Sequence, residues 1–110
     1  MGTTTRCQNV TYQTTVAAGA TEIYYPALNY EKMTVFIEPV SGGTASVTVS
    51  GDPVDDIAAG TATWHAGSAT LTGASANVYD ATEYGVNALK FAATTKAATF
   101  RVLLKGQGWY

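Results

Sequence analysis

The sequence predicts an all-β protein: an antiparallel β-sandwich or jelly roll of eight or nine short strands, rich in hairpins. Apolar and polar residues alternate in short runs, turn residues interrupt the chain roughly every ten residues, and no stretch has the spacing of an amphipathic helix. Short strands at that spacing are typical of sandwiches, jelly rolls and small barrels. With 110 residues, the chain is long enough for one domain with a sizeable core.

The chain divides into a flexible N-terminal arm, residues 1–8, and a single β-sandwich domain, residues 9–110. The arm is polar, rich in threonine and without periodicity. It lacks the apolar segment of a signal peptide, and no apolar run in the chain approaches the length of a membrane span. We therefore expect synthesis in a cytoplasm and no membrane partner.

The first strands are expected at Val10–Val16, which alternates, and at Glu22–Tyr25, which ends before Pro26 because proline donates no ladder hydrogen bond. Within the second of these, Tyr24 and Tyr25 must point to opposite faces, so at least one of them should lie near the surface. Residues 29–32 are interpreted as a turn.

A hairpin is expected from Met33–Pro39 and Ala45–Val49, which flank the glycine-containing loop at 41–43. Pairing Ile37 with Val47 would place the apolar residues of both strands on one face.

The middle of the chain is less regular. Val54–Ala59 has room for one helical turn after a cluster of turn residues. Ala62 and Trp64 match Ala69 and Leu71 across a short loop, which predicts a shorter hairpin. Residues 76–79 are expected to form another strand, and residues 80–83 a link.

The closing hairpin, residues 85–108, has the strongest pattern. A register that pairs Phe91 with Phe100 puts the apolar residues of both strands on the same face. The same register sets Lys90 opposite Arg101 on the outer face. Because like charges directly opposed are destabilising, this outer face is the first surface to test for a partner.

The amino-acid composition favours protein partners over nucleic acid. The chain is 46% hydrophobic but only 13% charged, about half the usual share of charged residues. Charged residues are depleted at the cores of interfaces, so this composition favours a domain partly buried against neighbours. The formal net charge of −2 argues against nucleic acid, which calls for a basic patch.

Residues for metal binding or catalysis are few. Asp52, Asp55 and Asp56 gather three carboxylates, yet a turn with a helix-capping aspartate explains them better than Ca²⁺. The single histidine, His65, sits in a predicted loop, and the single cysteine, Cys7, sits in the arm, so it forms no intrachain disulfide. No pair of glutamates has a spacing typical of glycosidases, and no phosphate loop is present. We expect no enzyme, no cofactor and no metal.

Aromatic residues are the remaining candidates for a binding function, because exposed tyrosine and tryptophan side chains stack on sugar rings or anchor protein interfaces. With its low-charge Thr/Ala/Gly-rich composition, its polar arm and its closing run from Ala88 to Gly106, the chain resembles small β-sandwich virion proteins of tailed bacteriophages. These proteins decorate or cement capsids, or form collars and fibre tips. The resemblance implies a non-enzymatic virion structural protein made in the bacterial cytoplasm.

The resemblance favours a capsid decoration or cement protein that binds the major capsid protein or other virion proteins and is itself an oligomer, with a trimer favoured. The alternative is a collar, tail or fibre-tip module that binds a host-surface glycan through exposed aromatics. The residues expected to bind partners lie in the arm, on the outer face of the closing hairpin and at the C-terminus: Thr3, Thr4, Thr5, Arg6, Lys90, Arg101, Trp109 and Tyr110.

Overall fold

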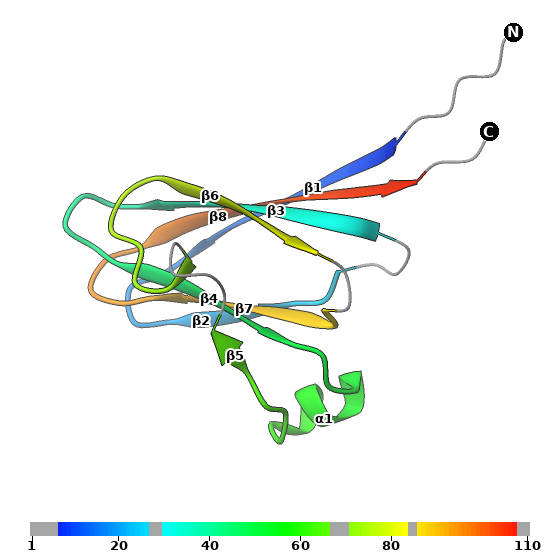
Figure 1. The fold of residues 1–110 in the computed structure, drawn as a ribbon. Coiled ribbons are helices and arrows are strands. Elements are labelled where there is room, and N and C mark those ends of the chain that lie inside the picture. Colours follow the sequence, from blue (N-terminus) through cyan, green and yellow to red (C-terminus); the bar gives the residue numbers. More distant parts are fainter. Residues whose placement is uncertain (1–6, 27–29, 67–70, 84–85, 108–110) are drawn as a thin grey trace, which may run out of the picture.

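The protein is described from a computed structural model, which covers residues 7–26, 30–66, 71–83 and 86–107. These residues form two antiparallel sheets packed face to face (Figure 1). Sheet A and sheet B, as we name them, are built from the strands β1 (Cys7–Val16), β2 (Thr21–Tyr24), β3 (Tyr30–Pro39), β4 (Ala45–Ser50), β5 (His65–Ala66), β6 (Val78–Glu83), β7 (Ala88–Ala93) and β8 (Ala98–Gln107), and the helix α1 (Val54–Ala59) lies between β4 and β5.

The strand order is that of a jelly roll. Sheet A has the order β1-β8-β3-β6 and sheet B the order β2-β7-β4-β5. Successive strands therefore lie in opposite sheets throughout, except that β4 and β5 pair within sheet B. Antiparallel pairing in two sheets, with connections that cross between them, is the jelly-roll arrangement. The predicted fold class is confirmed, and the strand order favours the jelly roll among its alternatives.

The predicted hairpins are wrong, although most of their strands are right. β7 pairs with β2 and β4, whereas β8 pairs with β1 and β3. Phe91 and Phe100 do meet, but across the core, with ring centroids 4.7 Å apart. Ile37 of β3 and Val47 of β4 likewise belong to the core but lie in different sheets. Alternation determines which face of a strand is buried, but it does not distinguish a partner beside the strand from one opposite it.

The third predicted hairpin is also absent. Trp64 precedes β5, which pairs with β4, and Leu71 lies in a 3₁₀-helical segment rather than a strand. Its other partner, Ala69, lies outside the described residues.

The core fills the space between the sheets with the inward-facing residues of both. Its fully buried side chains include Phe91, Phe100, Ile37, Leu89 and Leu104. Every one of these comes from a strand predicted by alternation. The core also takes in Leu71, which is 1% exposed and belongs to the connection between β5 and β6.

Three connections between the sheets meet at one end of the sandwich, as Figure 1 shows for the turns after β1, β3 and β7. The N–H of Gly19 donates to the carbonyl of Ala93 at 3.1 Å, and the N–H of Thr94 donates to the carbonyl of Thr44 at 3.0 Å. Gly19 has φ of 75°, which favours glycine. These backbone bonds tie the three turns together.

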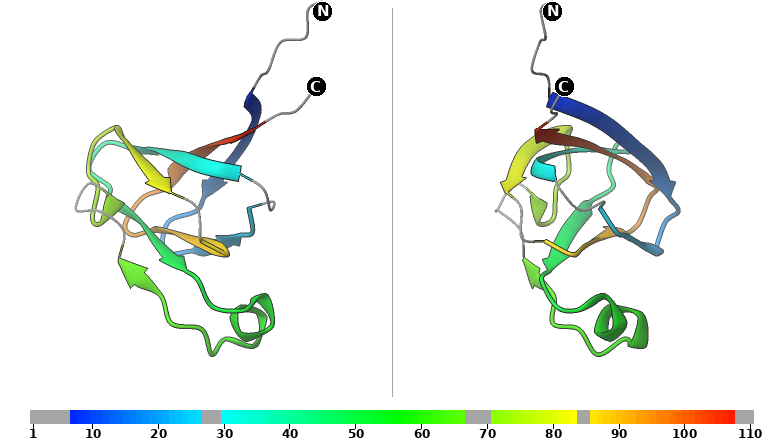
Figure 2. Two further views of the ribbon diagram at one scale, coloured as in Figure 1. Left: turned by 45° about the vertical axis from the view of Figure 1, so that its right-hand side comes forward. Right: turned by 90° about the vertical axis from the view of Figure 1, so that its right-hand side faces the viewer.

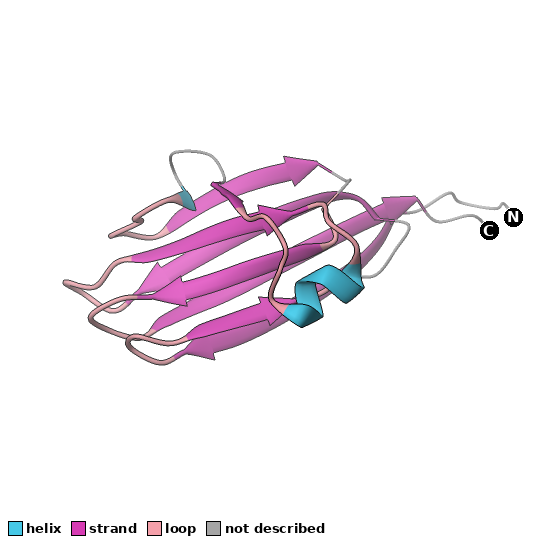
Figure 3. Cartoon of the chain, turned by 90° about the horizontal axis from the view of Figure 1, so that it is seen from below, coloured by secondary structure: helices cyan, strands magenta, loops and turns pink. Residues whose placement is uncertain are grey.

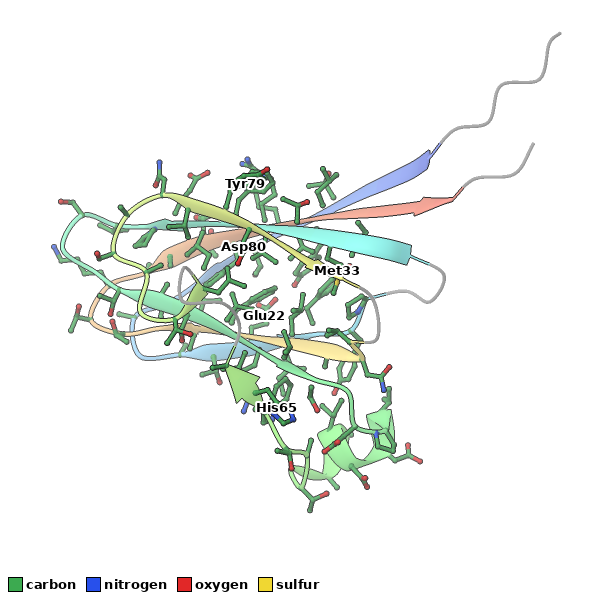
Figure 4. The ribbon with its side chains drawn as sticks, in the orientation of Figure 1. Glu22, Met33, His65, Tyr79 and Asp80 are labelled. Atoms are coloured by element: carbon green, nitrogen blue, oxygen red, sulfur yellow. The ribbon has the colours of Figure 1, made fainter. Side chains whose placement is uncertain are left out.

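The edge strands β1 and β2 face each other across the core and are joined by a polar and aromatic cluster. The rings of Tyr12 and Tyr24 stack with centroids 4.1 Å apart and planes 8° apart. Glu22 of β2 accepts a hydrogen bond from the Tyr12 hydroxyl and one of 2.9 Å from the Thr14 hydroxyl. Figure 4 shows Glu22 between the sheets. Tyr25, one residue beyond β2, is exposed, which confirms that at least one tyrosine of the pair lies at the surface.

The outer face of sheet B is partly covered by the segment 51–64, which includes α1 (Figure 3). Ser50 and Ala88 point away from the core in their strands, yet both are fully buried. Ile57 is the buried residue of α1, and the Asn87 side chain donates to the carbonyls of Gly51 and Asp52. The segment is thus bonded to the end of the sheet that it covers.

Several predicted boundaries change. β1 begins at Cys7, two residues inside the predicted arm. The residues interpreted as a turn at 30–32 and as a link at 80–83 belong to β3 and β6, because pairing with β8 and β3 extends both strands. The helical turn at Val54–Ala59 is confirmed. It ends at Gly60, whose φ of 80° lies in the left-handed region.

Replacing Phe100 with alanine tests the contact between the sheets. The substitution removes a fully buried ring that stacks on Phe91, and we expect the free energy of unfolding to fall by about 3–5 kcal/mol. Tyr79→Ala is the matched control, because Tyr79 is 66% exposed and its loss should change stability by no more than about 0.5 kcal/mol. Urea unfolding measures both. Similar losses in the two variants would contradict the packing.

The Tyr12–Glu22 contact predicts a loss of stability at alkaline pH. The hydrogen bond to Glu22, and secondly burial, raise the pKa of Tyr12 above its ordinary value of 10.0. A raised pKa of a phenol stabilises the fold below the unfolded-state pKa, and this contribution is lost as the pH rises through the folded-state pKa.

We therefore expect the stability advantage of the wild type over Tyr12→Phe to be constant below about pH 10 and to shrink above it. Urea unfolding of both proteins at a series of pH values measures the difference. Glu22→Gln removes the carboxylate charge and should flatten this dependence. An advantage of the same size at neutral and alkaline pH would refute this account of the contact.

Candidate interaction surface

The outer face of sheet A is the open face of the sandwich. No segment that the structure describes crosses it, in contrast to the outer face of sheet B with its covering segment 51–64 (Figures 1 and 2). On sheet A the outward positions of the four strands align in rows, because β1, β8, β3 and β6 are in register apart from one irregularity between Tyr30 and Lys32 of β3. Side chains in one such row are neighbours across the whole sheet.

One row combines a cation, an amide and two aromatic rings, and we call it the outer row. It consists of Gln13 of β1, Arg101 of β8, Phe36 of β3 and Tyr79 of β6, each opposite the next. The rings of Phe36 and Tyr79 stack with centroids 5.4 Å apart and planes 26° apart. Tyr79 is 66% exposed, and Figure 4 shows it on the outer side of sheet A.

Arg101 is held in the middle of this face by two partners. Its Nε donates to the side-chain oxygen of Gln13 at 3.0 Å, and Nη1 lies 3.9 Å from a carboxylate oxygen of Glu38. Both members of this ion pair are more than two-fifths exposed, so the pair itself adds little stability. Its effect is to fix the direction of the guanidinium, which leaves other N–H groups of the guanidinium open to a partner.

A shallow hollow lies beside the aromatic end of the outer row. It has a volume of ≈ 350 Å³ and is lined by residues of β3 and by residues at the start of β6: Phe36, Ile37, Glu38, Asn77, Val78 and Tyr79. It thus places a carboxylate and an amide next to two stacked rings. We call this the Tyr79 hollow.

This arrangement is suited to binding by surface contact. Tyrosine and arginine are enriched among the residues that contribute most to protein interfaces. Aromatic faces flanked by polar groups also suit the stacking of a sugar ring with hydrogen bonds at its rim. The groups of the outer row and the Tyr79 hollow include no histidine, cysteine or serine that could act as a nucleophile with its base.

The structure separates the residues that the sequence placed together. Arg101 lies on the outer face of sheet A, whereas Lys90 lies on the outer face of sheet B, with its Nζ 4.4 Å from the centroid of the Trp64 ring. The predicted opposition of Lys90 and Arg101 is wrong, since β7 and β8 belong to different sheets. The remaining predicted partner-binding residues, Thr3, Thr4, Thr5, Arg6, Trp109 and Tyr110, lie outside the described residues.

The structure also places the candidates for catalysis and metal binding. Cys7 belongs to β1, the edge of sheet A that faces β2, whereas His65 belongs to β5, at the far edge of sheet B. Among the described residues no group of three or more His, Cys, Asp or Glu converges as a metal site would require. Asp52 accepts a hydrogen bond of 2.7 Å from the N–H of Thr63 and does not cap α1, whose N-cap residue is Pro53.

Sequence reasoning missed the outer row as a unit. By alternation, Phe36 and Glu38 lie on the face of Met33–Pro39 opposite to Ile37, and an aromatic residue at such a position is itself a signal. Its alignment with Tyr79 and Arg101 depends on β3 lying between β6 and β8, which is a property of the strand order.

Comparison with known proteins does not assign the chain to a family. No known family model matches the chain, and no curated protein matches its sequence. Among solved structures, a protein of Bacillus endospore appendages, described as a novel family of disulfide-linked pili, is similar with a TM-score of 0.49. The match has 11% identity and covers 94% of this chain and 88% of that one. Within the described part of this chain, no helix is long and apolar enough to cross a membrane.

Proposed function

We propose that this chain is a non-catalytic structural protein of a larger assembly, and that it binds a neighbouring protein subunit through the outer face of sheet A. The observation that carries the proposal is the outer row, an exposed line of arginine and stacked aromatic residues on the open face of the sandwich. The low share of charged residues supports it, because charge is depleted at interface cores.

The kind of assembly follows from the resemblance to small virion proteins of tailed bacteriophages. Jelly rolls occur in viral capsid domains, which fits a protein that covers a capsid lattice, although fold alone does not assign function. On this proposal the chain attaches to the head surface and stabilises the particle by burying surface across subunit junctions. Its partner is the major capsid protein or another virion protein.

The attachment predicts a large effect of outer-row substitutions. Tyr79→Ala and Arg101→Ala should each weaken binding to particles that lack the chain by about 2 kcal/mol, roughly thirtyfold in Kd, with folding unchanged. The matched control is Lys90→Ala, because Lys90 lies on the opposite outer face. Its effect on binding should be no more than about 0.5 kcal/mol.

Pull-down of each variant with stripped particles measures the Kd, and heating of the reconstituted particles measures the release of nucleic acid. Equal binding by the outer-row variants and the control would refute attachment through this face. Particles whose heat resistance is the same with and without the chain would refute the stabilising role.

The Tyr79 hollow favours a second candidate function, a fibre-tip or collar module that binds a host-surface glycan. The exposed Tyr79 ring would stack on a sugar, and Glu38 and Asn77 would accept and donate hydrogen bonds at the rim.

This candidate predicts that the isolated protein binds oligosaccharides on a glycan array, and that Tyr79→Ala abolishes the signal. Tyr25→Ala is the control, because Tyr25 is an exposed tyrosine remote from the hollow. Particles with normal heat resistance but impaired adsorption to cells would favour the glycan-binding function over stabilisation of the head. An array without signal for the wild type would exclude it.

A further inference from the structure

The two sheets have four edge strands, and these differ in how they are protected against pairing with another chain. An edge strand presents unpaired N–H and C=O groups, and proteins protect such edges with short strands, charged residues or proline. β5 has two residues, and β2 has four and is followed by Pro26. β6 carries Asp80 and Glu83. All three therefore have a recognisable protective feature.

β1 has none of these features. It has ten residues, CQNVTYQTTV, without lysine, arginine, aspartate, glutamate, glycine or proline. It is rich in valine, threonine and tyrosine, which favour strands. It pairs with β8 along its whole length, and no strand of the described part of the chain lies on its other side. Alternate N–H and C=O groups of β1 therefore face outward along a long neutral edge.

We propose that β1 pairs with β1 of a second copy of this chain, antiparallel about a two-fold axis, so that sheet A continues across both copies. This interface uses the backbone edge of β1, whereas the outer row lies on the face of sheet A and takes only Gln13 from β1; the proposal goes beyond the proposed function.

The pattern of β1 suits pairing with itself. Tyr12, Thr14 and Val16 face the core, whereas Thr11 and Thr15 are exposed on the outer face. A strand that extends the sheet must place its inward residues on the same side, or its apolar set would face water. In a pairing about a two-fold axis, this condition is met whenever even-numbered residues of one copy lie opposite even-numbered residues of the other copy. Two copies then present the same surface to each other, as a closed dimer requires.

A second observation comes from the neighbouring edge of sheet B. β2 lies under β1, as the Tyr12–Tyr24 stack shows, and in Figure 2 the two edges lie on the same side of the sandwich. Ile23 and Tyr25 at this edge are large apolar side chains, 37% and 42% exposed. Pairing through β1 brings β2 of both copies to the same junction, where Ile23, opposite Lys90, faces the outer side of sheet B. Glu22, the carboxylate of β2, already accepts hydrogen bonds from Tyr12 and Thr14 of its own copy.

The charge of the exposed face of β1 provides the test. The double variant Thr11→Lys/Thr15→Lys places lysines of one copy opposite or diagonal to lysines of the other copy in the two-fold registers centred on β1. The double variant Thr11→Glu/Thr15→Glu places carboxylates in the same positions. Each double variant alone should dimerise at least about tenfold more weakly than the wild type. An equimolar mixture of the two should form a heterodimer, because opposite charges then face each other.

Sedimentation velocity over a concentration series measures the assembly state, and circular dichroism with thermal unfolding confirms that each variant is folded. The expected result is a wild-type dimer, two weakened variants and recovery of the dimer in the mixture. Hydrogen exchange should show protection of β1 amides that increases with wild-type concentration.

A wild type that stays monomeric at all concentrations would overturn the proposal, as would a trimer or a lysine variant that dimerises as well as the wild type. Tyr79→Ala, which changes the outer row on β6 at the other edge of sheet A, should leave the dimer intact. This control separates a failure of the dimer from a failure of the proposed attachment surface.

Discussion

The contact between Phe91 and Phe100 joins the two layers at their centre, and the rest of the structure depends on it. β8 lies between β1 and β3 in sheet A, and β7 lies between β2 and β4 in sheet B. The inward rings of these two interior strands therefore meet inside the sandwich. Tyr12 of β1 and Tyr24 of β2 extend this stack to the edge of the sandwich, and each of their ring centroids lies 6.4 Å from that of Phe91. A continuous line of aromatic rings therefore runs from the edge to the core.

This packing decides which surfaces remain for function. Because β7 and β8 lie in different layers, their outward residues point to opposite sides of the molecule. Lys90 faces the Trp64 ring beneath sheet B, while Arg101 joins Phe36 and Tyr79 on the open face of sheet A. The segment 51–64 covers one outer face in part, and the other stays available. The proposed attachment surface is thus a consequence of the crossing topology rather than of one local motif.

The sequence predicted the fold class and most strands because alternation reports burial directly. It predicted one buried face for the apolar residues on the two strands of Phe91 and Phe100. These residues, Leu89, Phe91, Phe100, Val102 and Leu104, are all at most 1% exposed. The predicted strand pairing was wrong, because a connection that crosses between the sheets and a hairpin within one sheet place the same residues inward. Phe91 and Phe100 are therefore in contact as predicted, but across the core rather than side by side in one sheet.

The candidate site was predictable only in part for the same reason. Arg101 was identified, but the argument for it, a repulsion with Lys90, does not hold in the structure. Its actual neighbours, Gln13 and Phe36, are more than sixty positions away in the chain and become adjacent through sheet order alone.

The central claim is that the outer row is buried in the native assembly. Hydroxyl-radical footprinting of Tyr79 and Trp64, in the assembly and after release from it, tests this most directly. We expect Tyr79 to be strongly protected in the assembly and Trp64, on the opposite side of the sandwich, to be modified equally in both states. Equal modification of Tyr79 in both states would contradict the claim.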